Sequence, residues 1–147
     1  MTTAELFALI QSDPTALALA KAGNDEECAA RLRTIAAPVY SEAMLTELSF
    51  YGLYADPADA ETVLKTIETV AASNPFVARL IKWLQPGAPG VNFGDPRIKA
   101  ALTAPVVSGG LGLSPDLAAP LLALGVLPPA ITAADVGAVR AEHGGKI

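Results

Sequence analysis

The sequence predicts an all-α or nearly all-α fold, a compact array of short helices that begin with proline. Three observations support this prediction. The 147-residue chain is 52% hydrophobic and only 17% charged, a balance that favours a buried core over disorder. Aromatic residues make up only 5% of the chain, so much of the apolar mass is alanine, leucine and valine, which suits closely packed helices. The third observation is a helix-start dipeptide that recurs along the chain.

This dipeptide joins a capping residue to a proline. An Asp, Asn or Ser side chain can accept hydrogen bonds from the free amides of a first helical turn. Proline fits the first helical position because its φ is preset and it has no amide to leave unpaired. The dipeptide occurs at Asp13-Pro14, Asp56-Pro57, Asn74-Pro75, Asp95-Pro96 and Ser114-Pro115. Many short helices are therefore expected.

Helix ends and apolar spacing complete the expected element list. Apolar residues recur at helical spacing along 57–72, which is the clearest amphipathic segment. Gly23 follows an alanine-rich segment and is expected to cap its C-terminus, because glycine tolerates a positive φ. The expected helices span 3–11, 14–22, 25–36, 41–54, 57–72, 75–84, 96–103, 115–124 and 133–142.

A single domain over 1–147 is expected, because this length matches one hydrophobic core. Turn-forming residues concentrate in 85–95 and allow a subdivision of that domain. The subdivision would consist of a helical core at 1–84, a linker at 85–95 and an apolar helical part at 96–147. At most one tiny β-hairpin or β-arm is expected, near 91–113.

The charge of the chain argues against a nucleic-acid partner. The net charge is -5 and the pI is about 4.7, whereas affinity for a phosphate backbone depends on clustered Lys and Arg. The basic residues are scattered in pairs, each expected on a solvated helix face: Arg31 with Arg33, Arg79 with Lys82, and Arg97 with Lys99.

The sequence also predicts neither a membrane span nor a secretory signal. The most apolar stretch, 100–134, is interrupted by prolines and glycines too often to form the roughly 20-residue apolar helix that a bilayer requires. The first residues carry neither a basic segment nor the long apolar run of a signal peptide. Secretion by that route is not expected.

Residues with catalytic or ligand chemistry are sparse, and no catalytic, cofactor-binding or metal-binding residue is predicted. The only histidine, His143, lies in a tail expected to fray, and the only cysteine, Cys28, lies on an apolar helix stripe, where burial is expected. The acids at 25–27 fit the first turn of a helix better than a cation site. The glycine-rich segment 108–113 lacks the Lys-Ser/Thr ending of a phosphate loop. We expect no enzyme and no cofactor.

Aromatic residues concentrate in the middle of the chain, where 48–54 carries apolar residues on all sides of the expected helix. Such a helix must be buried centrally or cover a partner, and both interpretations stay open here. Tyrosine and tryptophan are common interface anchors. The candidate partner-binding residues are therefore Phe50, Tyr51, Tyr54 and Trp83. Tyr51 and Trp83 are also expected to join one aromatic cluster.

Two segments carry a family resemblance. The segment from Leu9 to Asp25 and the segment from Leu113 to Val136 together resemble small helical proteins encoded by tailed bacteriophages of proteobacteria. The resemblance implies a phage or prophage origin and a location in the virion or the host cytoplasm.

The function expected from this resemblance is that of a non-enzymatic phage structural or assembly protein. It would work through protein–protein contacts in a multi-copy assembly, as a homo-oligomer or with other phage proteins. The alternative is a small phage-encoded binding module or inhibitor, whose acidic surface would engage a basic host protein.

Overall fold

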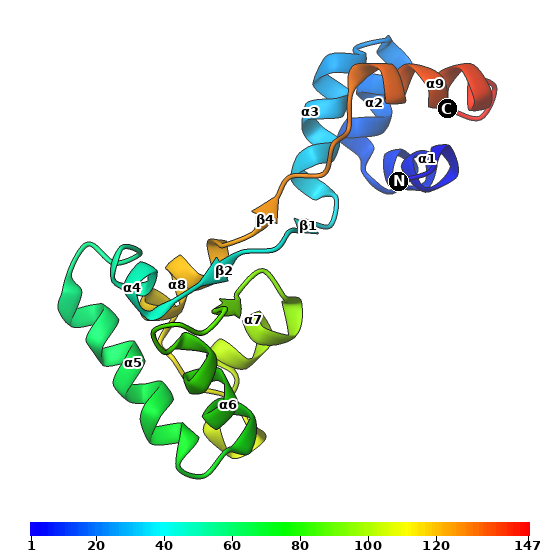
Figure 1. Cartoon of the computed structure of the whole chain (residues 1–147). Coiled ribbons are helices and arrows are strands. Elements are labelled where there is room, and N and C mark those ends of the chain that lie inside the picture. The colour runs from blue at the N-terminus through cyan, green and yellow to red at the C-terminus, as the bar shows by residue number, and fades with distance from the viewer. The chain divides into compact units, whose positions relative to one another are not determined.

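The computed structural model describes residues 1–147, and its dominant elements are nine α-helices (Figure 1). One 3₁₀ turn and four two-residue strands complete it, so the predicted near all-α class is confirmed. The helices are α1 (Thr3–Ser12), α2 (Pro14–Ala22), α3 (Asp25–Ile35), α4 (Glu47–Tyr51), α5 (Pro57–Ala71), α6 (Pro75–Leu84), α7 (Pro96–Thr103), α8 (Pro115–Ala123) and α9 (Ala133–His143). The strands are β1 (Val39–Tyr40), β2 (Met44–Leu45), β3 (Val91–Asn92) and β4 (Val126–Leu127), and the 3₁₀ turn is η1 (Val106–Ser108).

All the capping dipeptides begin helices, as predicted. In α2, α5, α6 and α7 the proline is the first residue and the preceding Asp or Asn accepts from a first-turn amide. Ser114 precedes Pro115 in the same way but makes no side-chain cap, so α8 begins with proline alone. Gly23 ends α2 with φ 77°, in the left-handed region that glycine tolerates.

The chain divides into two compact units. Unit 1 consists of Met1–Val39 and Pro128–Ile147, and unit 2 is Tyr40–Leu127. In unit 1 the helices α1, α2, α3 and α9 pack in a closed ring, each against two others. Figure 1 shows α9, near the C-terminus, beside the N-terminal helices. The core of unit 1 consists mainly of Leu6, Ile10, Ala16, Ala20, Cys28, Ala29, Leu32, Ile131, Val136 and Val139.

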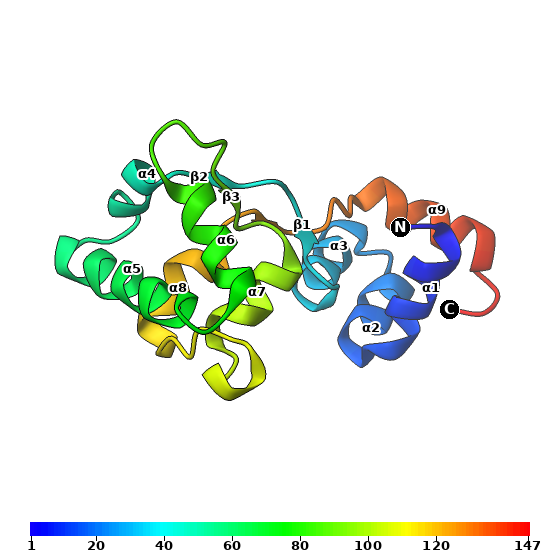
Figure 2. The same ribbon diagram turned by 60° about the horizontal axis from the view of Figure 1, so that its bottom comes forward.

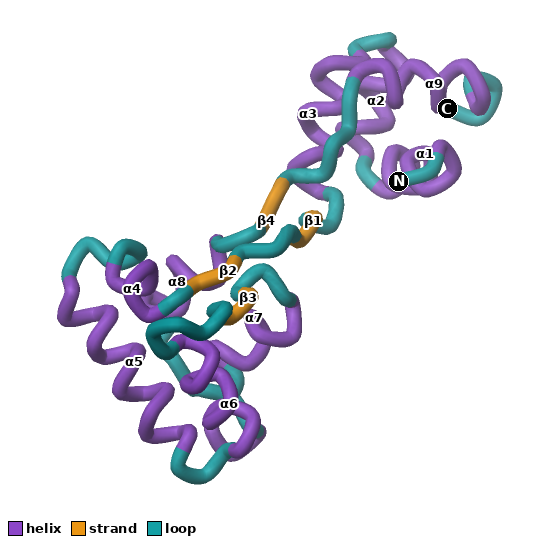
Figure 3. Tube along the Cα trace, in the orientation of Figure 1, coloured by secondary structure: helices purple, strands orange, loops and turns teal.

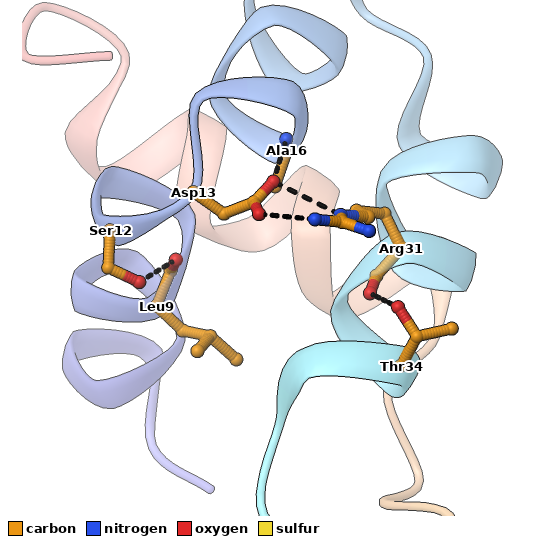
Figure 4. Close-up of polar contacts among 6 residues, drawn as sticks. All are labelled: Leu9, Ser12, Asp13, Ala16, Arg31 and Thr34. Carbon is orange, nitrogen blue, oxygen red and sulfur yellow. Dashed lines mark hydrogen bonds and ion pairs between the residues drawn. The ribbon is translucent and has the colours of Figure 1, made fainter.

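Polar contacts hold the ring of unit 1 at its helix ends. Asp13 caps α2 by accepting from the Ala16 amide at 2.8 Å, and the same carboxylate pairs with Arg31 of α3 at 2.7 Å (Figure 4). Arg140 of α9 pairs with Asp25 at the start of α3, also at 2.7 Å. These pairs join α2 to α3 and α3 to α9, although exposed ion pairs add little stability.

In unit 2 the helices share one apolar core, which includes the buried ring of Phe50. Helix α5 packs against α4 and α6, and α7 packs against α8, as the two ribbon views show (Figures 1 and 2). Phe50 is the largest fully buried side chain of the protein. It shares one core cluster with apolar residues of all five helices and of β2 and β3.

The predicted helix over 41–54 is wrong, because only Glu47–Tyr51 is helical. Met44 and Leu45 instead pair antiparallel with Asn92 and Val91 in β3. The Asn92 side chain also accepts from the Ala43 amide at 2.9 Å. Residues distant in sequence therefore supply the hydrogen bonds of this backbone segment. The helix begins only after Thr46, which forms a capping box with Ser49.

Two small sheets form, β1 with β4 and β2 with β3, where one hairpin or arm was expected near 91–113 (Figure 3). Only β3 lies in that range. Glycines permit a close backbone approach at Ser41: a Cβ would lie 1.8 Å from the Ser41 carbonyl oxygen at Gly94 and 2.3 Å from it at Gly125. A side chain at either position would force that segment away from the Ser41 backbone.

The unit boundaries lie elsewhere than the turn-forming residues. Residues 85–95, expected as a linker, lie inside unit 2 and include β3. The chain passes between the units at 39–40 and again at 127–128. The glycine-rich segment 108–113 begins at the last residue of the η1 turn and continues as an irregular connection.

Candidate protein-binding surface

Two of the four candidate partner-binding residues belong to the core. Phe50 is fully buried, and its ring contacts those of Tyr54 and Phe93, each at a centroid distance of 5.9 Å. The Tyr54 hydroxyl donates to the Leu117 carbonyl at 2.7 Å. Burial, aided by the charge of Asp59, raises the pKa of Tyr54 to about 12. These two rings offer no surface to a partner and stabilise unit 2 instead.

Tyr51 lies at the surface among carboxylates. Its hydroxyl donates to a carboxylate oxygen of Glu61 in α5. This hydrogen bond is the largest cause of a raised pKa of the Tyr51 hydroxyl, followed by burial and by the charges of Glu61, Glu47 and Glu68. Tyr51 therefore marks an acidic surface formed by α4 and α5.

The predicted cluster of Tyr51 with Trp83 does not form. The aromatic ring pairs of unit 2 are Phe50 with Tyr54 and Phe50 with Phe93. Leu80 and Leu84 direct α6 into the core, and Trp83 lies one residue, about 100° of helical rotation, away from Leu84. Trp83 is accordingly 45% exposed.

Trp83 belongs to an exposed helix surface that we call the α6 face, made of Phe76, Arg79, Lys82 and Trp83. Phe76, Arg79 and Trp83 follow the i, i+3, i+7 spacing of one helical side. Phe76 is 45% exposed, like Trp83. Neither Arg79 nor Lys82 pairs with an acid of the chain. The face thus combines two aromatic rings with two cations that have no ion-pair partner.

A small hollow lies on the other flank of α6, and we call it the acidic pocket. Its apolar floor consists of Leu64, Ile67, Ile81 and Leu84, and its polar rim of Glu47, Glu68 and Gln85. Its volume is about 110 Å³. Pockets for small-molecule ligands usually start at roughly 300 Å³, so this one has the size of a single side chain. Its composition suits a cation on an aliphatic stem.

Sequence reasoning missed Lys99, which is only 6% exposed. It was expected on a solvated helix face with Arg97, but only Arg97 is exposed. The Lys99 ammonium donates to the carbonyls of Leu121, Leu122 and Leu124 at the end of α8. Burial lowers its pKa. The spacing of Ile98, Lys99 and Leu102 carried the signal, since it places Lys99 beside the apolar stripe of α7.

The remaining chemical side chains have structural surroundings. Cys28 is fully buried, as predicted, and its thiol donates to the Ala16 carbonyl at 3.4 Å. Burial and the charges of Asp25 and Asp13 raise the pKa of this thiol. His143 is the last residue of α9, and its ring stacks on that of Phe7 in α1 with a centroid distance of 4.3 Å, where fraying was expected.

The acids at 25–27 occupy the first turn of α3, as predicted, and Asp25 is paired with Arg140. No group of three or more His, Cys, Asp or Glu side chains is placed to hold a metal ion. None of the helices has the length and apolar character needed to cross a membrane.

The aromatic and charged surface of unit 2 is therefore the strongest candidate site in the described chain. It combines the α6 face, the acidic pocket and the carboxylates around Tyr51. Comparison with known proteins adds no relative: no family model, no curated protein and no solved structure matches this chain.

Proposed function

We propose that this chain is a non-enzymatic bacteriophage structural or assembly protein that works through protein–protein contacts in a multi-copy assembly. The observation that carries the proposal is the α6 face, on which Phe76 and Trp83 are each 45% exposed beside two unpaired cations. Aromatic rings and arginine are the residue types most enriched at the energetic centres of protein interfaces. The phage origin rests on the resemblance of the two end segments.

The exposed apolar residues of unit 2 favour contact with protein. Val107 is 96% exposed and Leu48 is 85% exposed, in addition to the two rings of the α6 face. Single exposed apolar residues are ordinary, but rings flanked by unpaired charges form the mixed apolar and polar surface typical of interfaces.

A photo-crosslinking amino acid in place of Trp83 tests the proposal in phage-producing cells. We expect crosslinks to defined protein bands, followed by mass spectrometry of purified particles to count copies of the chain. The matched control places the same amino acid at Thr62, an exposed position of α5 outside both surfaces. Equal crosslinking at both positions, together with absence of the chain from particles and their precursors, would refute the proposal.

A further inference from the structure

The two surfaces on either flank of α6 are opposite in charge. The α6 face carries Arg79 and Lys82, and the acidic pocket carries Glu47 and Glu68. None of these four side chains forms an ion pair within the chain. Each surface therefore has the charges that the other lacks, with apolar residues beside them.

The dimensions of the acidic pocket agree with this complementarity. A volume of about 110 Å³ accepts one side chain, and the apolar floor with two carboxylates at the rim suits the aliphatic stem and charged head of lysine or arginine. Leu48 is 85% exposed next to Glu47 and offers an apolar contact for an aromatic ring. The α6 face supplies both the cationic and the aromatic side chains, in adjacent helical turns.

The two surfaces also adjoin one another. Gln85, at the rim of the acidic pocket, lies three residues after Lys82, a spacing at which residues are neighbours on a helix surface, so the two surfaces meet along α6. When complementary surfaces adjoin, a twofold axis brings each onto the other twice and closes the assembly at a dimer.

We infer that the occupant of this surface is a second copy of the chain: the α6 face of each protomer docks on the acidic pocket of the other, with Arg79 or Lys82 inserted between Glu47 and Glu68. Phe76 and Trp83 then pack beside Leu48 and Tyr51 of the other copy. This inference rests on the proposed function and names one contact of the assembly.

Sedimentation equilibrium of the full chain tests the inference. We expect the average mass to rise toward twice the 15.0 kDa of one chain as the protein concentration increases to about 500 µM. This range includes the dissociation constants expected for small interfaces. Association should weaken between 0.1 and 1 M salt, because the screening length falls from about 10 Å to about 3 Å. A chain that stays monomeric throughout would overturn the inference.

Two charge variants locate the contact. Arg79→Glu with Lys82→Glu reverses the α6 face, and Glu47→Gln with Glu68→Lys reverses the acidic pocket. Each variant alone should lose association by at least about tenfold, and mixing the two should restore it, because the reversed surfaces again face opposite charges. Variants that still associate alone, or a mixture that stays monomeric, would overturn the inference.

Matched controls separate the contact from folding and net charge. Lys21→Glu and Glu26→Lys change exposed residues of unit 1 and should leave association unchanged. Circular dichroism should give each variant the helix content of the wild type. If a reversal unfolds unit 2, the neutral pair Arg79→Gln with Lys82→Gln replaces it, with the same expected loss of association.

A monomeric chain whose Trp83 position crosslinks to a different protein would refute this inference alone and leave the proposed function standing.

Discussion

The Nζ atom of Lys99 in α7 donates a hydrogen bond to the carbonyl oxygen of Leu122 in α8, 2.7 Å away. The same ammonium reaches the carbonyls of Leu121 and Leu124. The last carbonyls of a helix have no partner within it, and α8 has no basic residue of its own in its last turn. Lys99 is therefore a C-terminal cap supplied by a neighbouring helix.

Replacing Lys99 by Met should lower the free energy of unfolding by about 1–3 kcal/mol, because buried carbonyls lose their donor. Urea denaturation measures the change. Arg97→Met is the matched control, since Arg97 lies on the same helix but pairs with Asp95 at the surface and should change stability little. Equal effects of the two substitutions would contradict the capping role.

A second prediction separates core from surface among the aromatic candidates. Phe50→Ala should cost about 3–5 kcal/mol, because it leaves a cavity under a fully buried ring. Trp83→Ala should cost far less and should reduce self-association instead, because that side chain is 45% exposed. Thermal denaturation at a concentration where the chain is monomeric compares them. A comparable loss of stability in both variants would place Trp83 in the core.

A third prediction concerns acid stability. The hydrogen bond from Arg31, with that from the Ala16 amide, lowers the pKa of Asp13 to about 2 from its usual 3.8. A lowered folded-state pKa stabilises the fold above about pH 4, and this contribution is lost as the pH falls toward about 2. Asp13→Asn keeps an oxygen to cap α2 but removes the charge, so its stability should depend less on pH in this window.

Denaturant titrations between pH 2 and pH 6 measure this dependence. Glu26→Gln serves as the control, since it removes an exposed carboxylate that forms no ion pair. A pH profile of Asp13→Asn that parallels the wild type would show that the Asp13–Arg31 pair contributes nothing to acid stability.

The fourth prediction is that the Cys28 thiol resists labelling in the folded protein. It is fully buried, and its raised pKa reduces the reactive thiolate. A colorimetric thiol reagent should react only as fast as unit 1 opens, and rapidly after denaturation. In a Cys28→Ala background, Lys21→Cys provides an exposed thiol for comparison. Equal native labelling rates at the two positions would contradict the prediction.

The sequence by itself determined where most helices begin and end. Helices α2, α5, α6, α7 and α8 begin at the predicted prolines, because a cap and a preset φ act within one turn of chain. Gly23 ends α2 for an equally local reason. The amphipathic stripe of α5 likewise required no knowledge of its partner. These features follow from interactions between residues close in sequence.

Only the tertiary structure decided how these helices are used. Residues 41–46 are extended because β3 and the Asn92 side chain supply hydrogen bonds from about 50 positions away, which local propensity does not report. The same long-range packing buries Phe50, exposes Trp83 and turns Lys99 into a cap for α8. Helix α9 packs against α1 and α3, although the whole of unit 2 separates it from them in sequence. Which side of a helix is covered depends on distant partners, and one-dimensional spacing does not contain that information.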